Sequence, residues 1–350
     1  MATFDQFADL PIEVESYELE GLEREVSSAF TRLSTVIHLH GNGEDGVGED
    51  VVYDALDHIA LQETGPVHDL TGPRTLGEFC ELIHGLELFP APPVREVSPL
   101  YRRWAFESAA LDLALRQAGT TLHERLGITP QPVTFVVSLR LGDPPTIEPI
   151  RRRLERYPGL RFKLDPVSAW TPELIEEVVA TGAVDSLDLK GLYKGSVVDQ
   201  GADPVLYERV VNAFPDAWIE DPALTPDTEA VLADAHDRIT WDAIIHGIAD
   251  IEALPFKPRM VNVKPSRLGG LKEVCDTRDY CREHEIGMYG GGQFELGPGR
   301  GHIQYLASLF HPHTPNDVAP AGYNDPDPVD GLPQSPLPPS PSDVGFRWGT

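Results

Sequence analysis

Charged residues recur at the ends of short apolar runs in the second half of the chain. There are five of them, each 22 to 32 residues beyond the last: Lys163, Asp188, Glu220, Asp242 and Lys264. A parallel barrel of alternating strands and helices repeats at about this interval, and catalytic groups gather at the carboxyl ends of its strands. The order lysine, three carboxylates, lysine predicts two bases on either side of a bound cation.

The composition limits the classes of partner. The chain has 350 residues, 41% of them hydrophobic, and its 56 acidic and 28 basic residues give a formal net charge of −28. Such a surface repels a phosphate backbone, so we expect no nucleic-acid partner. No apolar run approaches the roughly 20 residues that a membrane-spanning helix needs, and the acidic N-terminus lacks the basic-then-apolar order of a secretory signal. We therefore expect a cytoplasmic protein without membrane contact.

Residues 1–130 have the pattern of an α+β domain. Residues 12–61 are rich in predicted strands, and the glycine-rich segment GNGEDGVGED (41–50) predicts a hairpin. Two helices are expected at 75–88 and 103–119, the second ending at a glycine suited to a helix C-cap.

Residues 131–321 alternate between apolar strands and helices, which implies parallel strand pairing. A last short strand near 316–318 brings the expected number of strands to eight. We therefore predict an α/β protein in which a (β/α)8-type (TIM) barrel carries an N-terminal α+β capping domain. Residues 322–350 are rich in proline and aspartate, and we expect them to pack back on the capping domain as an extended segment.

Three carboxylates on consecutive predicted strands are the central feature of the expected site: Asp188, Glu220 and Asp242. Any one of them could simply cap the next helix, and Asp242 is the weakest candidate taken alone. Packed together without a cation, three carboxylates repel one another. A divalent cation removes this repulsion, and an all-oxygen set favours Mg²⁺ over zinc, with Mn²⁺ able to substitute. We therefore expect a magnesium site.

Two lysines, Lys163 and Lys264, flank the carboxylates. Strand alternation puts Arg161 and Asp165 on the same face as Lys163, and Asn262 on the face of Lys264. Lysine is rarely buried in a barrel strand unless it is paired, so each lysine could merely neutralise a ligand carboxylate. Alternatively, a desolvated pocket beside a cation favours the neutral amine, which makes each lysine a usable base.

These residues resemble the enolase superfamily, and within it the mandelate racemase-like, muconate lactonizing enzyme subgroup. The most specific matches are WIEDP and VKPSRLGGL, and RFK stands at the K-x-K strand of the family. DGVGED and ESAALDLALRQAG resemble two segments of its capping domain, and GGGQFELGPGRGH resembles its glycine-rich seventh strand. The resemblance covers nearly the whole chain. It implies Mg²⁺ on Asp188, Glu220 and Asp242, with Lys163 and Lys264 as catalytic bases.

The sequence departs from the family at several positions. The first metal strand reads Asp188-Leu189-Lys190, where the family shows Asp-Ala-Asn. Lys190 could therefore bridge a ligand, contact the substrate or neutralise Asp165, and an alternative register would make Asp165 itself the ligand. Gln293 stands where methionine is usual, and the segment that closes over substrate is expected at 27–33. The residues assigned to substrate contacts or to support of the ligands are Arg161, Asp165, Lys190, Asn262, Gln293 and Glu295.

The resemblance implies an enzyme that removes the proton α to a carboxylate and stabilises the enolate with Mg²⁺. Lysines on both faces favour an isomerase, either a racemase or epimerase or a cycloisomerase. The alternatives are a lyase that resembles the o-succinylbenzoate synthase branch of the family, which dehydrates its substrate, and a non-catalytic relative that binds metal and carboxylate. The expected partner is a small-molecule carboxylate, and we expect a homo-oligomer.

Overall fold

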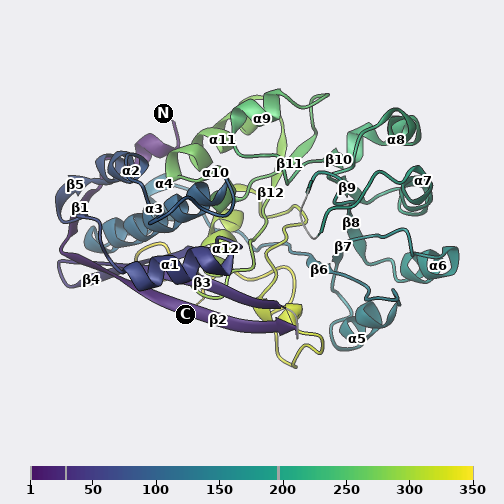
Figure 1. Cartoon of the computed structure of the whole chain (residues 1–350), viewed down its shortest axis with the longest axis horizontal. Helices are drawn as coiled ribbons and strands as arrows, with labels where there is room; N and C mark the ends of the chain where they lie inside the picture. Colours follow the sequence, from purple (N-terminus) through teal and green to yellow (C-terminus); the bar gives the residue numbers. More distant parts are fainter. Residues whose placement is uncertain (1, 28–29, 195–197, 350) are drawn as a thin grey trace.

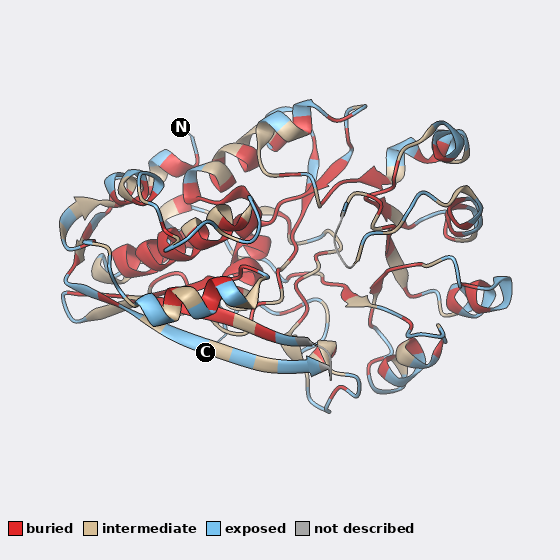
Figure 2. Ribbon diagram, viewed as in Figure 1, coloured by how far each residue is buried: buried red, intermediate tan, exposed pale blue. Residues whose placement is uncertain are grey.

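The computed structural model describes residues 2–27, 30–194 and 198–349. Figure 1 shows two parts side by side, a capping domain built from the first third of the chain and a barrel with helices around its outer edge. The longest helix, α3 (Ser98–Gln117), runs through the capping domain and is buried along most of its length, whereas the outer barrel helices are exposed on the side that faces away from the strands (Figure 2).

The capping domain contains a three-stranded antiparallel sheet of order β2-β3-β4. The expected hairpin is present, with its turn between β3 and β4. A side chain at Gly48 of β4 would place a Cβ 1.9 Å from the carbonyl oxygen of Ala105, and one at Gly46 would place a Cβ 2.3 Å from that of Ala109, also on α3. Glycine is therefore required here so that helix and sheet can touch. The strands and helices of this domain are β1 (Pro11–Val14), β2 (Ser16–Ser27), β3 (Phe30–Gly41), β4 (Glu44–Asp50), α1 (Ala55–Thr64), β5 (Gly72–Thr75), α2 (Leu76–His84), α3 and α4 (Leu122–Leu126), with a 3₁₀ turn η1 (Phe4–Gln6) before them.

The barrel is closed, which confirms the predicted (β/α)8 fold. Five parallel strands have the order β10-β9-β8-β7-β6, and β11 pairs with β12. The Asn262 N–H donates to the carbonyl of Trp241 at 3.0 Å and joins β11 to β10. Residues 316–317 take the place of the eighth strand. Isolated parallel bridges pair them with Gly291 on one side and Phe135 on the other, which closes the ring. The named strands are β6 (Val137–Leu139), β7 (Phe162–Leu164), β8 (Val184–Asp188), β9 (Trp218–Glu220), β10 (Ile239–Thr240), β11 (Met260–Asn262) and β12 (Gly287–Tyr289).

Local sequence signals begin many of the barrel helices. The side chains of Thr171, Asp203 and Thr225 accept backbone N–H groups in the first turns of α6, α7 and α8, and a proline follows each cap. The helices are α5 (Glu148–Arg156), α6 (Pro172–Ala180), α7 (Pro204–Ala213), α8 (Pro226–Leu232), α9 (Ile248–Glu252), α10 (Pro265–Leu268), α11 (Leu271–Glu283) and α12 (Pro298–Phe310), with 3₁₀ turns η2 (Ala233–Arg238) and η3 (Ala321–Asn324). Among the described residues, none of these helices has the length and apolarity to cross a bilayer.

The end of the chain lies on both parts of the molecule. The Leu337 N–H donates to Val133 at 2.8 Å, at the start of the first barrel strand. Farther on, the Phe346 N–H and the Arg347 guanidinium each donate to the Asp112 carboxylate of α3 at 2.7 Å. Near the start of the tail, Asp325 also pairs with Arg24 of β2. The proline-rich tail therefore contacts both the barrel and the capping domain.

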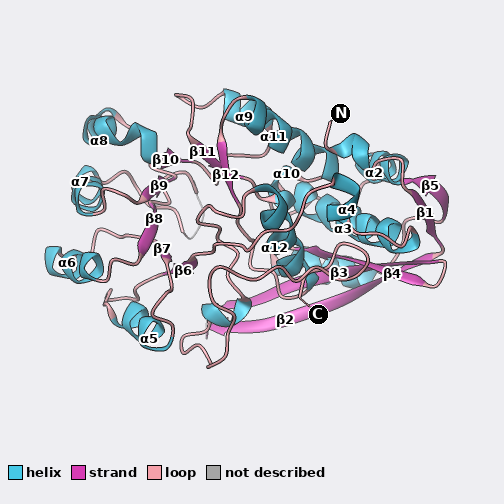
Figure 3. Cartoon of the chain, turned by 180° about the vertical axis from the view of Figure 1, so that it is seen from behind, coloured by secondary structure: helices cyan, strands magenta, loops and turns pink. Residues whose placement is uncertain are grey.

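Two buried charges of the capping sheet hold the loop at residues 293–299, which leads into α12. The Glu49 carboxylate accepts N–H groups from Leu296, Gly297 and Gly299 at 2.6 to 3.0 Å. The Arg32 guanidinium donates to the carbonyls of Gln293 and Phe294, two residues of the same loop. Seen from behind in Figure 3, α12 lies between the barrel strands and the capping sheet. The capping domain therefore fixes the backbone of a loop at the barrel mouth.

We expect Glu49→Ala to lower the free energy of unfolding by about 3 kcal/mol, because several buried donors lose their acceptor. Urea denaturation followed by circular dichroism measures this loss. The control is Glu44→Ala, which removes a partly exposed pair with Arg116 and should cost less than about 1 kcal/mol. Equal losses in the two variants would contradict the role assigned to Glu49.

Candidate active site at the carboxyl end of the barrel

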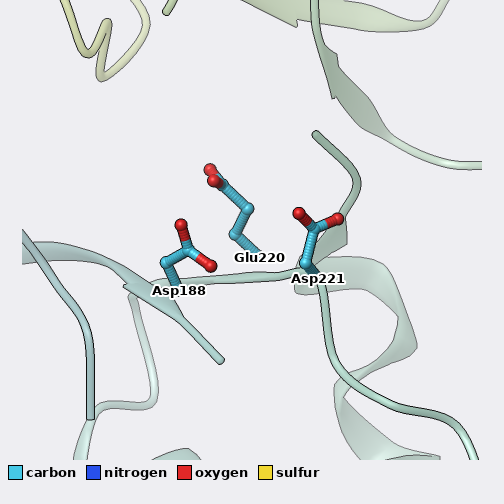
Figure 4. Close-up of side chains that lie close together, drawn as sticks. All are labelled: Asp188, Glu220 and Asp221. Carbon is cyan, nitrogen blue, oxygen red and sulfur yellow. The ribbon is translucent and has the colours of Figure 1, made fainter. Parts of the chain in front are cut away.

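Three buried carboxylates meet at the mouth of the barrel. Oxygen atoms of Asp188, Glu220 and Asp221 all lie within 4.8 Å of one another. Asp188 and Glu220 are partners in the parallel register of β8 and β9, so their side chains leave the sheet on the same face. Asp221 follows with φ of 49°, in the left-handed region. Figure 4 shows the three carboxylates side by side at these two strand ends.

The Lys163 ammonium lies against this acidic group. It donates to Glu220 and is 3.3 Å from Asp188 and 3.5 Å from Asp317, and its side chain is only 3% exposed. Burial alone would lower the pKa of this lysine, but the three carboxylates outweigh burial and raise it well above its usual value. Without a metal ion, Lys163 is therefore held as an ammonium.

The second predicted base, Lys264, lies two residues after the end of β11 and contacts a different carboxylate. Its ammonium donates to Asp242 at 2.7 Å. Burial lowers the pKa of Lys264, and the positive charges of Arg267 and Lys163 add to the shift, while Asp242 opposes it. The two lysines are thus shifted in opposite directions, because Lys163 faces several carboxylates and Lys264 shares one carboxylate with an arginine.

Asp242 lies at the site but outside the group of three carboxylates. Its Oδ2 accepts from Lys264 and from the Tyr193 hydroxyl at 2.8 Å, and its Oδ1 pairs with Arg267 at 2.6 Å. Both of its oxygens are therefore paired with side chains of this chain. Its assignment as a metal ligand remains a prediction.

Asp221 was not predicted from the sequence. Its two oxygens accept the backbone N–H groups of Asp242 and Ala243, each at 2.9 Å, so it supports the segment that carries Asp242. Burial raises the pKa of Asp221 to about 7, and the Asp242 and Asp188 carboxylates contribute to the shift. The second acid of the WIEDP motif is the sequence signal that could have identified it.

Lys190 and Asp165 form the outer edge of the cluster. The backbone N–H of Lys190 donates to Asp188 Oδ1 at 3.1 Å, and its ammonium pairs with Asp188 Oδ2. The same ammonium is 3.8 Å from Asp165 Oδ1 and 4.7 Å from the centre of the Tyr193 ring. Asp165 also accepts from Arg140 at 3.0 Å.

The remaining predicted residues differ in their partners and in their distance from the site. Asn262 and Gln293 are buried, and neither side-chain amide has a hydrogen-bond partner among the described residues. Glu295 pairs with Arg300 at 3.0 Å.

The prediction for Arg161 requires a correction, because the structure does not bring this residue to the site. It precedes β7 and is paired with Asp185 at the other end of the strands.

Arg32 belongs to the segment expected to close over a substrate (27–33), and it holds the 293–299 loop. Residues 28 and 29 of that segment lie outside the described residues.

Three further side chains at the site escaped prediction. The Tyr289 hydroxyl donates to Glu220, while Arg267 and Tyr193 both contact Asp242. Arg267 stands in the VKPSRLGGL motif, three residues after Lys264, which is a usable signal. The two tyrosines have no comparable spacing or motif.

The donor set suits a hard divalent cation. Asp188, Glu220 and Asp221 offer only oxygen atoms, which is the ligand chemistry that Mg²⁺ prefers. Burial raises the pKa of Glu220 well above its usual value, and the charges of Asp188 and Asp242 raise it further, while Lys163 opposes them. A cation among these oxygens would relieve that repulsion.

Comparison with known proteins confirms the resemblance to the enolase superfamily. The chain is 26% identical over 337 residues to an o-succinylbenzoate synthase of Geobacillus stearothermophilus, covering 89% of this chain and 85% of that protein. It is 27% identical over 304 residues to an N-succinylamino acid racemase of Thermus thermophilus, covering 83% and 79%.

Solved structures agree on the fold. A dipeptide epimerase from Enterococcus faecalis superposes with a TM-score of 0.70 at 16% identity, covering 97% of this chain and 100% of that chain. A dipeptide epimerase from Methylococcus capsulatus, complexed with a Mg ion, gives 0.63 at 20% identity, covering 87% and 89%.

Two family descriptions match this chain along most of its length. Residues 5–125 match "Domain of unknown function (DUF8230) N-terminal domain", and residues 129–325 match "Domain of unknown function (DUF8230) C-terminal domain". The boundary between the two matches falls between α4 and the first barrel strand.

If Asp188 is a metal ligand, Asp188→Asn should weaken Mg²⁺ binding by about 100-fold, and Asp165→Asn should weaken it much less. Isothermal titration calorimetry with MgCl₂ measures both affinities. The reverse order would favour the alternative register, in which Asp165 is the ligand.

Proposed function

The chain belongs to the DUF8230 family, and we propose that it is a Mg²⁺-dependent enzyme of the enolase-superfamily type. It would remove the proton α to the carboxylate of a small molecule by a lysine base, and act as a racemase, epimerase or cycloisomerase. The observation that carries this proposal is the pair of buried lysines on either side of a buried acidic group.

The barrel geometry supports chemistry on two faces of one carbon. Lys163 stands on β7 and Lys264 two residues after β11, and these are the second and sixth of the eight barrel strands. Residues on strands four apart in a ring of eight project from opposite sides of its mouth. The carboxylates come from the strand ends between them. A planar enolate bound over these acids would therefore have one amine on each side.

A general base alone lowers the activation barrier by less than an enzyme of this type requires. A positioned base contributes roughly 10²–10⁴-fold, or about 3–5 kcal/mol, whereas enzymes usually lower barriers by about 8–23 kcal/mol. Asp188 and Glu220, with Asp242 or Asp221 as the third ligand, would hold Mg²⁺, which would supply positive charge where the enolate oxygens develop. With the enolate held in this way, one lysine would take the α proton and the opposite lysine would return a proton to the same carbon.

A dehydratase is the second candidate. The observation in its favour is the similarity to an o-succinylbenzoate synthase over 89% of this chain. In that reaction class one lysine would take the α proton and a leaving group would depart, so no proton need return to the same carbon. A non-catalytic relative is the third possibility, because every amine of the site is already paired with a carboxylate.

Deuterium exchange separates these candidates. We expect a panel of N-acylamino acids, dipeptides and cyclic carboxylates in D₂O with Mg²⁺ to include a compound that gains α-deuterium, measured by ¹H NMR. Exchange with inversion identifies a racemase or epimerase, and consumption to an unsaturated product identifies a dehydratase. A bound carboxylate that never exchanges or reacts would contradict catalysis.

Lys163→Ala and Lys264→Ala should each abolish inversion of the substrate identified in this way, because each removes the amine on one face. Lys272→Ala, which changes an exposed lysine of α11, is the control and should keep wild-type turnover. Circular dichroism and Mg²⁺ titration verify folding and metal binding. Full activity in either active-site variant would remove that lysine from the mechanism.

A further inference from the structure

We infer that Lys190 is a movable counterion of the metal site. In this inference its ammonium neutralises Asp188 when no divalent cation is bound, and moves to Asp165 when Asp188 takes up the metal. The inference rests on the proposed function, since it presumes that Asp188 is a metal ligand.

The backbone places Lys190 where only a short movement is needed. Its φ of 53° lies in the left-handed region, and its N–H donates to Asp188 Oδ1, so the main chain turns back over the carboxylate. The ammonium pairs with the other oxygen, Asp188 Oδ2. It also lies 4.7 Å from the centre of the Tyr193 ring, within the range of a cation–π contact.

Asp165 offers the second position. Its Oδ2 accepts from Arg140, but its Oδ1 is buried and has no hydrogen-bond partner among the described residues. The Lys190 ammonium is 3.8 Å from that Oδ1, just outside hydrogen-bond distance. A buried carboxylate oxygen without a donor is costly, so this oxygen is ready to receive the ammonium.

The charge balance explains why a cation must move. Five buried carboxylates face three buried cationic side chains and the partly exposed Lys190 ammonium at the site: Asp165, Asp188, Glu220, Asp221 and Asp242 against Lys163, Lys264, Arg267 and Lys190. Mg²⁺ would add two positive charges to this nearly balanced set, next to the ammonium on Asp188. Lys190 is the least enclosed of the four, with 13% of its side chain exposed against 3 to 7% for the others. Its displacement therefore costs least.

A double-mutant cycle on Mg²⁺ affinity tests this exchange, with isothermal titration calorimetry on the full chain. Lys190→Met keeps the length of the side chain and removes its charge, so Mg²⁺ should bind about tenfold more tightly. Asp165→Asn removes the second position, so Mg²⁺ should bind at least about threefold more weakly. In the Lys190→Met background, Asp165→Asn should change the affinity by less than about twofold.

Two further variants separate charge from other effects. Lys190→Arg keeps the positive charge and should stay near wild-type affinity. Lys194→Met makes the same substitution at an exposed lysine four residues on and should leave the affinity unchanged. Thermal unfolding without metal verifies that each variant is folded.

The results that overturn the inference differ from those that overturn the proposed function. Unchanged or weaker binding in Lys190→Met, with normal binding in the wild type, ends the role of Lys190 and leaves the proposed function standing. An Asp165→Asn effect of equal size in both backgrounds shows that Asp165 acts without Lys190 and ends the exchange. If the wild type binds no Mg²⁺ and exchanges no α proton, both the inference and the proposed function fail.

Discussion

The crowding of buried carboxylates at the barrel mouth is the constraint on which the rest of the site depends. Acids taken out of water repel one another and favour their protonated forms. Here each acid has a compensating partner: Lys163 on Glu220, Lys190 on Asp188, and Arg267 with Lys264 on Asp242. Asp221 is stabilised differently, by two backbone N–H groups. The amines that suit proton transfer are therefore the same groups that offset part of the repulsion among the acids.

The features that depend on the repeat of strand and helix, and on the position of a residue at the end of a strand, could be predicted from the sequence. Strand ends spaced by one strand–helix unit meet at one rim of a barrel, so the positions of Lys163, Asp188, Glu220 and Lys264 could be predicted without coordinates. The closed ring followed from the alternation of strands and helices, although its eighth strand is reduced to isolated bridges.

Contacts of single side chains could not be predicted in this way. Asp221 reaches the site because its backbone adopts a left-handed turn, and Tyr289 because its side chain is long enough to contact Glu220. Neither feature produces a repeating pattern in the sequence. Arg161 shares a face with Lys163 in an ideal strand. It lies before the strand begins, however, where Asp185 is the nearer partner. The sequence marked Lys190 as unusual, but its place between Asp188 and Asp165 depends on distances that only a structure supplies.

The hydrogen bonds that Glu49 and Arg32 form with the 293–299 loop limit how far the capping domain and the barrel can diverge independently in evolution. Both charges are buried and bind main-chain atoms, so they constrain the length and the path of the loop. A hybrid that joins this capping domain to the barrel of a distant relative would need the loop transplanted with it. Recombination between lineages should therefore preserve the hairpin and the loop as one inherited unit.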